Sequence, residues 1–121
     1  MNTAVVVAAS ASARFFLVEP RPEQRPITAH VHLTEVERLT DDRAVGKRNF
    51  ALHFTDEIAD FTRSQNVAKV VFAAEPHLLE RLSDAVDKAL PTGTKRVDVA
   101  EDLSWQTPEH ILEALIRHSA L

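Results

Sequence analysis

Two short, almost entirely apolar segments constrain the fold of this chain more than any other feature. Residues 4–9 read AVVVAA and residues 67–74 read VAKVVFAA, so both are rich in β-branched side chains. Apolar runs of this length are typical of strands that are covered on both faces. We therefore expect an α/β protein in which these two segments are neighbouring strands in the middle of the sheet.

Three more strands are predicted around this pair. Residues 13–18 (ARFFLV) follow the first segment after three small residues, and so short a link joins only antiparallel neighbours. From Ile27 apolar and polar residues alternate, which predicts a third strand with one solvent-exposed face. The alternation changes phase at Glu35–Val36, which indicates a bulge or the end of that strand. Residues 95–99 alternate as well and predict an outer strand.

Three helices are predicted from the periodicity of apolar residues. In residues 50–63 the apolar side chains recur at helical spacings, and the same spacing is found in residues 76–90 and 107–118. Each of the last two segments has a proline close to its start, which suits the first turn of a helix. Two polar stretches, residues 19–26 and 40–49, are expected to be surface loops.

The order of these elements is strand, strand, strand, helix, strand, helix, strand, helix. Because strand–helix–strand crossovers are right-handed, the later strands are parallel to each other, and the opening hairpins make the sheet mixed. The expected sheet order is 3-2-1-4-5 with strand 2 antiparallel to the rest, which is the ribonuclease-H-like fold. With 121 residues the chain is expected to form one domain, residues 1–121.

Composition and charge exclude several function classes. The chain has no cysteine, which rules out disulfide scaffolds, thiolate metal sites and cysteine nucleophiles. With 14 basic and 18 acidic residues its net charge is −4, so no broad cationic face is available to duplex DNA. No apolar stretch approaches the roughly 20 residues of a membrane span. Residues 4–9 lack the preceding basic residues and the length of a secretion signal. We therefore expect a cytoplasmic protein without a membrane partner.

Carboxylates are missing where nucleases of this fold hold metal ions. These enzymes bind two metals between carboxylates, one of which normally lies in the middle of the first strand, but here that strand is apolar. Glu75 and Asp102 follow the fourth and fifth strands, where open α/β sheets place ligand sites. A hydrolase that uses these two residues is one interpretation. The favoured one is that Glu75 stabilises a helix N-terminus and Asp102 is a solvated loop residue.

Three histidines form another candidate site. His30 and His32 lie two residues apart on one face of the third strand, and His53 lies on the helix that follows. Imidazoles in this arrangement are able to ligate zinc or another transition metal, so a metal-dependent enzyme is an alternative to a binding function. A histidine pair on an exposed strand face needs no metal to explain it, and our leading expectation is a protein without a cofactor.

The remaining candidates belong to a binding surface. Arg43, Lys47 and Arg48 lie in the polar stretch before the first helix, beside Gly46, and are suited to contact phosphate groups. The phosphate-loop pattern GxxxxGK[ST] does not occur. Trp105, the only tryptophan, is either an exposed interaction anchor or a lid that packs its ring across the end of the sheet. We favour the lid, because tryptophan buries a large apolar area.

Three segments of the sequence resemble one protein family. Residues 5–20 (VVVAASASARFFLVEP) resemble its opening pattern of a strand, a turn of small residues and A-R-F-F-x-V. Residues 70–79 (VVFAAEPHLL) and 97–104 (VDVAEDLS) resemble its second half. On these segments the chain resembles the bacterial host-attachment proteins. That family is related to bacterial proteins that look like the middle domain of archaeal and eukaryotic peptide-chain release factors.

The resemblance implies a ribonuclease-H-like domain with a non-catalytic binding function. Release factors carry Gly-Gly-Gln between the third strand and the first helix, whereas residues 42–49 (DRAVGKRN) contain one glycine and no glutamine, so peptide release is not expected. The leading hypothesis is a module that contacts the ribosome or RNA through Arg43, Lys47, Arg48 and the neighbouring face. A further hypothesis is a homo-oligomer in which the third strand of one copy pairs edge to edge with the third strand of another.

Overall fold

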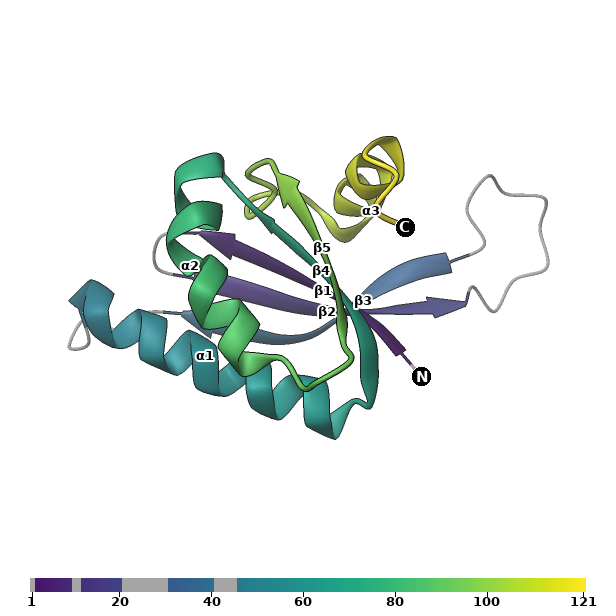
Figure 1. Cartoon of the computed structure of the whole chain (residues 1–121). Coiled ribbons are helices and arrows are strands. Elements are labelled where there is room, and N and C mark those ends of the chain that lie inside the picture. The colour runs from purple at the N-terminus through teal and green to yellow at the C-terminus, as the bar shows by residue number, and fades with distance from the viewer. Residues whose placement is uncertain (1, 10–11, 21–30, 41–45) are drawn as a thin grey trace.

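A mixed sheet with helices on both faces makes up the part of the chain that the computed structural model describes, residues 2–9, 12–20, 31–40 and 46–121 (Figure 1). The strands are β1 (Asn2–Ala9), β2 (Ser12–Pro20), β3 (Val31–Thr40), β4 (Val67–Ala74) and β5 (Lys95–Ala100). The helices are α1 (Gly46–Ser64), α2 (Pro76–Ala89) and α3 (Pro108–Arg117). Within these residues, no helix is long and apolar enough to cross a membrane.

The sheet has the predicted ribonuclease-H-like order. Its strands follow one another as β3-β2-β1-β4-β5, with β1 antiparallel to β2 and parallel to β4. β2 is antiparallel to β3, and β4 is parallel to β5. In the central register Val6 lies between Phe15 of β2 and Phe72 of β4, and all three side chains are fully buried. The prediction that the two apolar segments are adjacent central strands is therefore confirmed.

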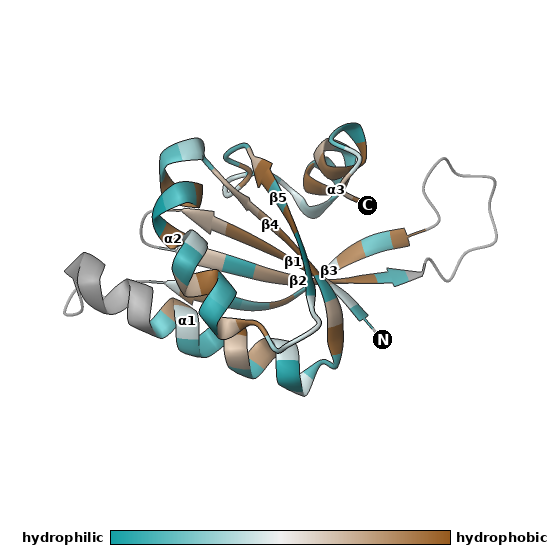
Figure 2. Cartoon of the chain, viewed as in Figure 1, coloured by the Kyte–Doolittle hydropathy of each residue, from teal (hydrophilic) through white to brown (hydrophobic). Residues whose placement is uncertain are grey.

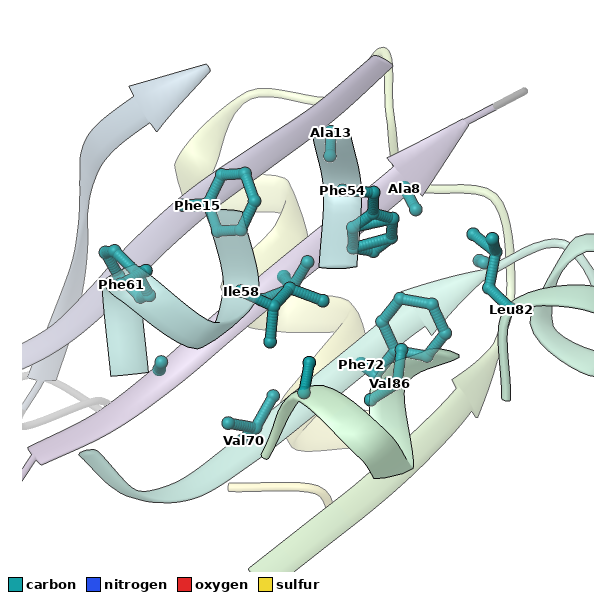
Figure 3. Close-up of a cluster of buried hydrophobic side chains, with 14 of the residues drawn as sticks. Ala8, Ala13, Phe15, Phe54, Ile58, Phe61, Val70, Phe72, Leu82 and Val86 are labelled. Atoms are coloured by element: carbon teal, nitrogen blue, oxygen red, sulfur yellow. The ribbon is translucent and has the colours of Figure 1, made fainter. Parts of the chain in front are cut away.

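One face of the sheet packs against α1 and α2. Phe15 on β2 contacts two aromatic rings of α1, with ring centroids 6.4 Å from Phe54 and 5.3 Å from Phe61 (Figure 3). Phe54 also lies 5.9 Å from the ring of Phe72 on β4, and Ile58 is buried in the same cluster. Hydrophobic residues gather in the central strands and on the sheet-facing sides of the helices (Figure 2). The aromatic residues of α1 thus form the centre of this core, as their helical spacing predicts.

The other face of the sheet packs against α3. Val5, Val7 and Phe16 point to this side and are buried together with Ile111 and Leu115 of the helix. Alternate residues of β1 therefore enter two different cores, because successive side chains of a strand point to opposite faces. This explains why residues 4–9 of β1 are apolar at every position rather than at every second one.

The structure confirms one local prediction for β3 and corrects two boundaries. Phe15 pairs with Glu37 and Phe16 with Glu35, so Val36 is the extra residue of a bulge, as the change of phase predicts. β2 continues to Pro20, beyond the predicted end, because its last residues pair with β3. α1 begins at Gly46 instead of Phe50, since residues 46–49 contain no proline and the one glycine lies at the end of the helix, where its low helix propensity costs little. β3 lies at the edge of the sheet, and self-association through it stays a prediction.

Candidate binding surface at the carboxyl edge of the sheet

Three parallel strands end at the same edge of the sheet. β1, β4 and β5 run in one direction, so Ala9, Ala74 and Ala100 lie at this carboxyl edge. The antiparallel β2 starts there and β3 ends there, since Ser12 pairs with both Ala9 and Thr40. Ligand sites of open α/β sheets lie at the carboxyl ends of the strands. The side chains at this edge therefore form the candidate site.

A buried arginine connects three parts of the chain at this edge. Arg14 of β2 is only 8% exposed, and its Nε donates to Glu35 Oε2 of β3 at 3.0 Å. Its Nη1 donates to the backbone oxygens of Ser104 at 3.3 Å and of Gln106 at 2.6 Å. The guanidinium also lies 5.0 Å from the ring centroid of Phe16. Arg14 thus ties β2 and β3 to the segment that links β5 to α3.

Glu35 is shared between two arginines. Besides the bond from Arg14, it accepts hydrogen bonds from Nη2 of Arg38 at 2.8 Å and 3.0 Å. Burial alone would raise the pKa of the Glu35 carboxyl, but the hydrogen bonds and charges of Arg14 and Arg38 outweigh burial and lower this pKa. The buried guanidinium of Arg14 therefore faces a carboxylate that keeps its charge, which satisfies the requirement that buried charges be paired.

The segment of residues 101–107 is fixed by its own hydrogen bonds. Asp102 Oδ1 accepts from the backbone N–H of Ser104 at 3.0 Å and from its hydroxyl at 2.6 Å. The N–H of Gln106 donates to the oxygen of Leu103 at 3.1 Å, and the side chain of Leu103 is buried. Thr107 then caps α3, as predicted, by accepting from the N–H of His110. Together with Arg14, these bonds hold the segment in one conformation.

Trp105 stands on this fixed segment and is 75% exposed. The prediction that it forms a lid packed across the end of the sheet is therefore wrong, and the exposed alternative is the observed one. The buried apolar side chain of the segment is that of Leu103, which packs into the core beneath α3. The backbone oxygens on both sides of Trp105 are directed to Arg14. The only tryptophan of the protein is therefore presented to solvent on a rigid support.

The basic residues predicted for binding are only partly described. Arg43 lies outside the described residues. Lys47 and Arg48 belong to the start of α1, so the prediction that they lie in a loop is wrong, although their side chains are outside the description. β3 ends at the carboxyl edge with Thr40, and α1 begins six residues later in the sequence.

Among the residues that the structure describes, the predicted metal ligands do not form a cluster. His30 lies outside them, His32 is half-buried on β3 opposite Glu19 of β2, and His53 is exposed on α1. The described part of the chain holds no group of three or more histidine, aspartate or glutamate side chains suited to a metal ion. Because one of the three histidines is outside this part, the three-histidine site stays a prediction.

The two carboxylates of the hydrolase interpretation serve local structure. Glu75 is the N-cap of α2, and its carboxylate accepts from the N–H of Leu78 at 2.6 Å, which confirms its prediction as an acid at a helix N-terminus. Asp102 is occupied by Ser104. One oxygen of each carboxylate is thus engaged in a local hydrogen bond that a structural role explains.

Sequence reasoning missed a pair of carboxyl groups between β3 and α1. A side-chain hydrogen bond with Glu37 of β3 raises the pKa of the Glu57 carboxyl on α1 to about 7. Partial burial and the negative charges of Glu37, Asp60 and Asp56 act in the same direction. The signal in the sequence is weak, because the two residues become neighbours only when α1 packs on the sheet.

This carboxyl pair predicts a pH-dependent stability. The pKa of Glu57 is about 7 in the folded protein, against an ordinary value of 4.5. Protonated Glu57 therefore contributes its full stabilisation below pH 4.5, and this contribution is lost as the pH rises through 7. We expect Glu57→Gln to match the wild type near pH 5 and to be more stable by about 1 kcal/mol near pH 8.5, after allowance for solvent screening. Urea unfolding at both pH values measures this difference.

The matched control for this experiment is Glu80→Gln, which makes the same change at an exposed position of α2. It should leave the difference from the wild type independent of pH. A Glu57→Gln variant that is equally or less stable than the wild type at the higher pH would contradict the raised pKa of Glu57.

Comparisons with known proteins identify a similar fold and the family of this chain. The structure is similar to that of RuvC from Thermus thermophilus, with a TM-score of 0.60 and 7% sequence identity, over 82% of this chain and 63% of the other. The present chain therefore matches less than two thirds of RuvC, and the likeness concerns the fold alone. A comparison with curated proteins gave no significant match. A family model described as "Protein required for attachment to host cells" matches residues 31–115, so the chain belongs to this host-attachment family.

Proposed function

We propose that this protein is a non-catalytic binding module, which contributes to the attachment named in its family description by holding a partner at the carboxyl edge of its sheet. The observation that carries the proposal is the exposed Trp105 on a segment fixed by Arg14. Interfaces are often dominated by a few large aromatic side chains, and a prearranged one loses little conformational entropy on binding.

The composition of β1 supports a role without catalysis. Two-metal nucleases need oxygen ligands at their central strands, whereas Ala4 to Ala8 are apolar and buried on both faces of the sheet. A carboxylate at any of these positions would have to enter a dry core, where an unpaired charge is very unfavourable. Residues 4–8 of β1 therefore stabilise the fold and supply no carboxylate ligand, which supports a binding function at the edge of the sheet.

We further propose that the partner is the bacterial ribosome and that the protein acts in the cytoplasm. Two observations support this choice. The segments at residues 5–20 and 70–79 resemble the host-attachment family, for which we propose a relationship to a release-factor domain, and Arg43, Lys47 and Arg48 are close in sequence to the carboxyl edge. The net charge of −4 disfavours tight binding to naked nucleic acid. A ribosome offers basic proteins in addition to RNA, which suits an acidic chain better.

Sedimentation with purified bacterial ribosomes tests this proposal. We expect the wild-type protein to pellet with ribosomes and the triple variant Arg43→Ala, Lys47→Ala, Arg48→Ala to stay largely in the supernatant, since it loses the three positive charges that we propose to contact phosphate groups. The matched control replaces three exposed basic residues elsewhere, Arg81, Lys88 and Lys95, with alanine and keeps the same net charge as the variant.

Three outcomes would count against the proposal. A wild-type protein that does not pellet contradicts ribosome binding. Equal loss in both triple variants shows that net charge alone decides the result. Equal binding to protein-free ribosomal RNA means that RNA, and not the assembled ribosome, is the partner.

A further inference from the structure

β3 is the longer of the two edge strands of the sheet. It has ten residues and only β2 as a neighbour among the described strands, whereas the opposite edge strand, β5, has six residues. The outer side of a long edge strand is a template on which a strand of another molecule is able to pair. Proteins close such edges by shortening the strand, by placing charged side chains on it or by a bulge.

The bulge of β3 lies in the middle of this edge. Phe15 and Phe16 are consecutive on β2 and pair with Glu37 and Glu35, so Val36 is one residue in excess. A bulge bends its strand and increases the local twist. The regular parts of β3 are therefore residues 31–35 and 37–40, and neither offers an incoming strand a straight edge as long as β3 itself.

The pairing of β3 with β2 does not need the extra residue. If Val36 is removed, Glu35 and Glu37 become consecutive and still lie opposite Phe16 and Phe15, so every other pair keeps its register. The strand then becomes regular along its whole length. Its exposed charges allow two copies to pair antiparallel, because Glu37 of each copy is able to lie opposite Arg38 of the other.

We infer that the bulge at Val36 prevents β3 from pairing edge to edge with a second copy of this chain. The inference is the opposite of the homo-oligomer hypothesis, and it is independent of the proposed ribosomal partner. It rests on the position of the bulge in the longer edge strand and on a register with β2 that is complete without Val36. What the extra residue changes is the shape of the outer edge.

Deletion of Val36 tests this inference. Light scattering coupled to size exclusion measures the mass of both proteins in solution up to about 1 mM. We expect the wild type to be a monomer throughout this range and the deletion variant to dimerise at least about tenfold more tightly. Hydrogen exchange locates the contact. In the variant it should slow with rising concentration in residues 31–40 and not in β5, because strand pairing protects backbone N–H groups.

The matched control is Val36→Ala, which keeps the extra residue and removes most of a side chain that is 43% exposed. It should stay a monomer like the wild type, so a dimer of the deletion variant is due to the regular strand and not to the loss of the valine side chain. Circular dichroism checks that both variants are folded.

Four results would overturn the inference. The first is a wild-type dimer in which residues 31–40 become protected from exchange. The second is a folded deletion variant that remains a monomer at about 1 mM. The third is a deletion variant that does not fold, since β3 would then need Val36 for its own pairing with β2. The last is a Val36→Ala variant that dimerises although it retains the bulge.

Discussion

Replacing Phe15 with alanine should lower the free energy of unfolding by about 4 kcal/mol. The side chain is fully buried on β2 and contacts the rings of Phe54 and Phe61, with which it forms the centre of the core beneath α1. The loss combines the transfer of a large apolar side chain with the cavity that remains, and the contacts with the two aromatic rings contribute further. Because domains of this size are stable by only about 5–15 kcal/mol, the effect is large. Urea unfolding followed by circular dichroism measures it.

The control for this substitution is Val36→Ala on the neighbouring strand. Val36 is the bulged residue of β3 and is 43% exposed, so its truncation should change stability by less than about 0.5 kcal/mol. A Phe15→Ala variant that loses less than about 1 kcal/mol would show that the contacts between β2 and α1 do not support the fold in solution.

Replacing Arg14 with methionine should cost about 3 kcal/mol. Methionine keeps much of the volume but leaves the oxygens of Ser104 and Gln106 without their donor and removes one of the two arginines that neutralise Glu35. The segment around Trp105 then loses its anchor. We expect faster rotation of the indole, measured as lower fluorescence anisotropy, together with the loss of stability in urea.

Arg38→Met is the matched control for this experiment. Arg38 also binds Glu35, but it is exposed and makes no bond to residues 101–107 in the described structure. We expect a much smaller loss of stability and an unchanged anisotropy, because exposed ion pairs contribute little. If both variants behaved alike, the charge of Glu35, and not the anchoring of the segment, would be the reason for the effect.

The fold could be predicted because its signals are local. Residues 4–9 and 70–74 are apolar at every position, which is typical of a strand between two helical layers. The bulge at Val36 changes the phase of alternation, and the cap at Glu75 precedes a first-turn proline. Each signal lies within a few residues of the element it specifies, so no knowledge of the tertiary structure was needed.

The candidate site could not be predicted to the same extent, because its contacts join distant parts of the chain. We predicted from its size that Trp105 is buried. In the structure Leu103 occupies the core position of this segment, and Trp105 is exposed to solvent. Arg14 is a charged residue inside an apolar strand, which is a signal that a partner must exist. Its partners, Glu35 and Gln106, were not evident, because they come into contact only after the sheet and α3 have assembled.

The contact of Arg14 with Ser104 joins residues 90 positions apart in the chain. Closing so long a loop is entropically unfavourable until the intervening strands have paired, so this contact forms late in folding. During synthesis, a nascent chain without its C-terminal part can build the opening hairpins but cannot yet fix the tryptophan. The proposed binding surface is therefore completed last, which would restrict recognition of a partner to chains whose synthesis has passed α3.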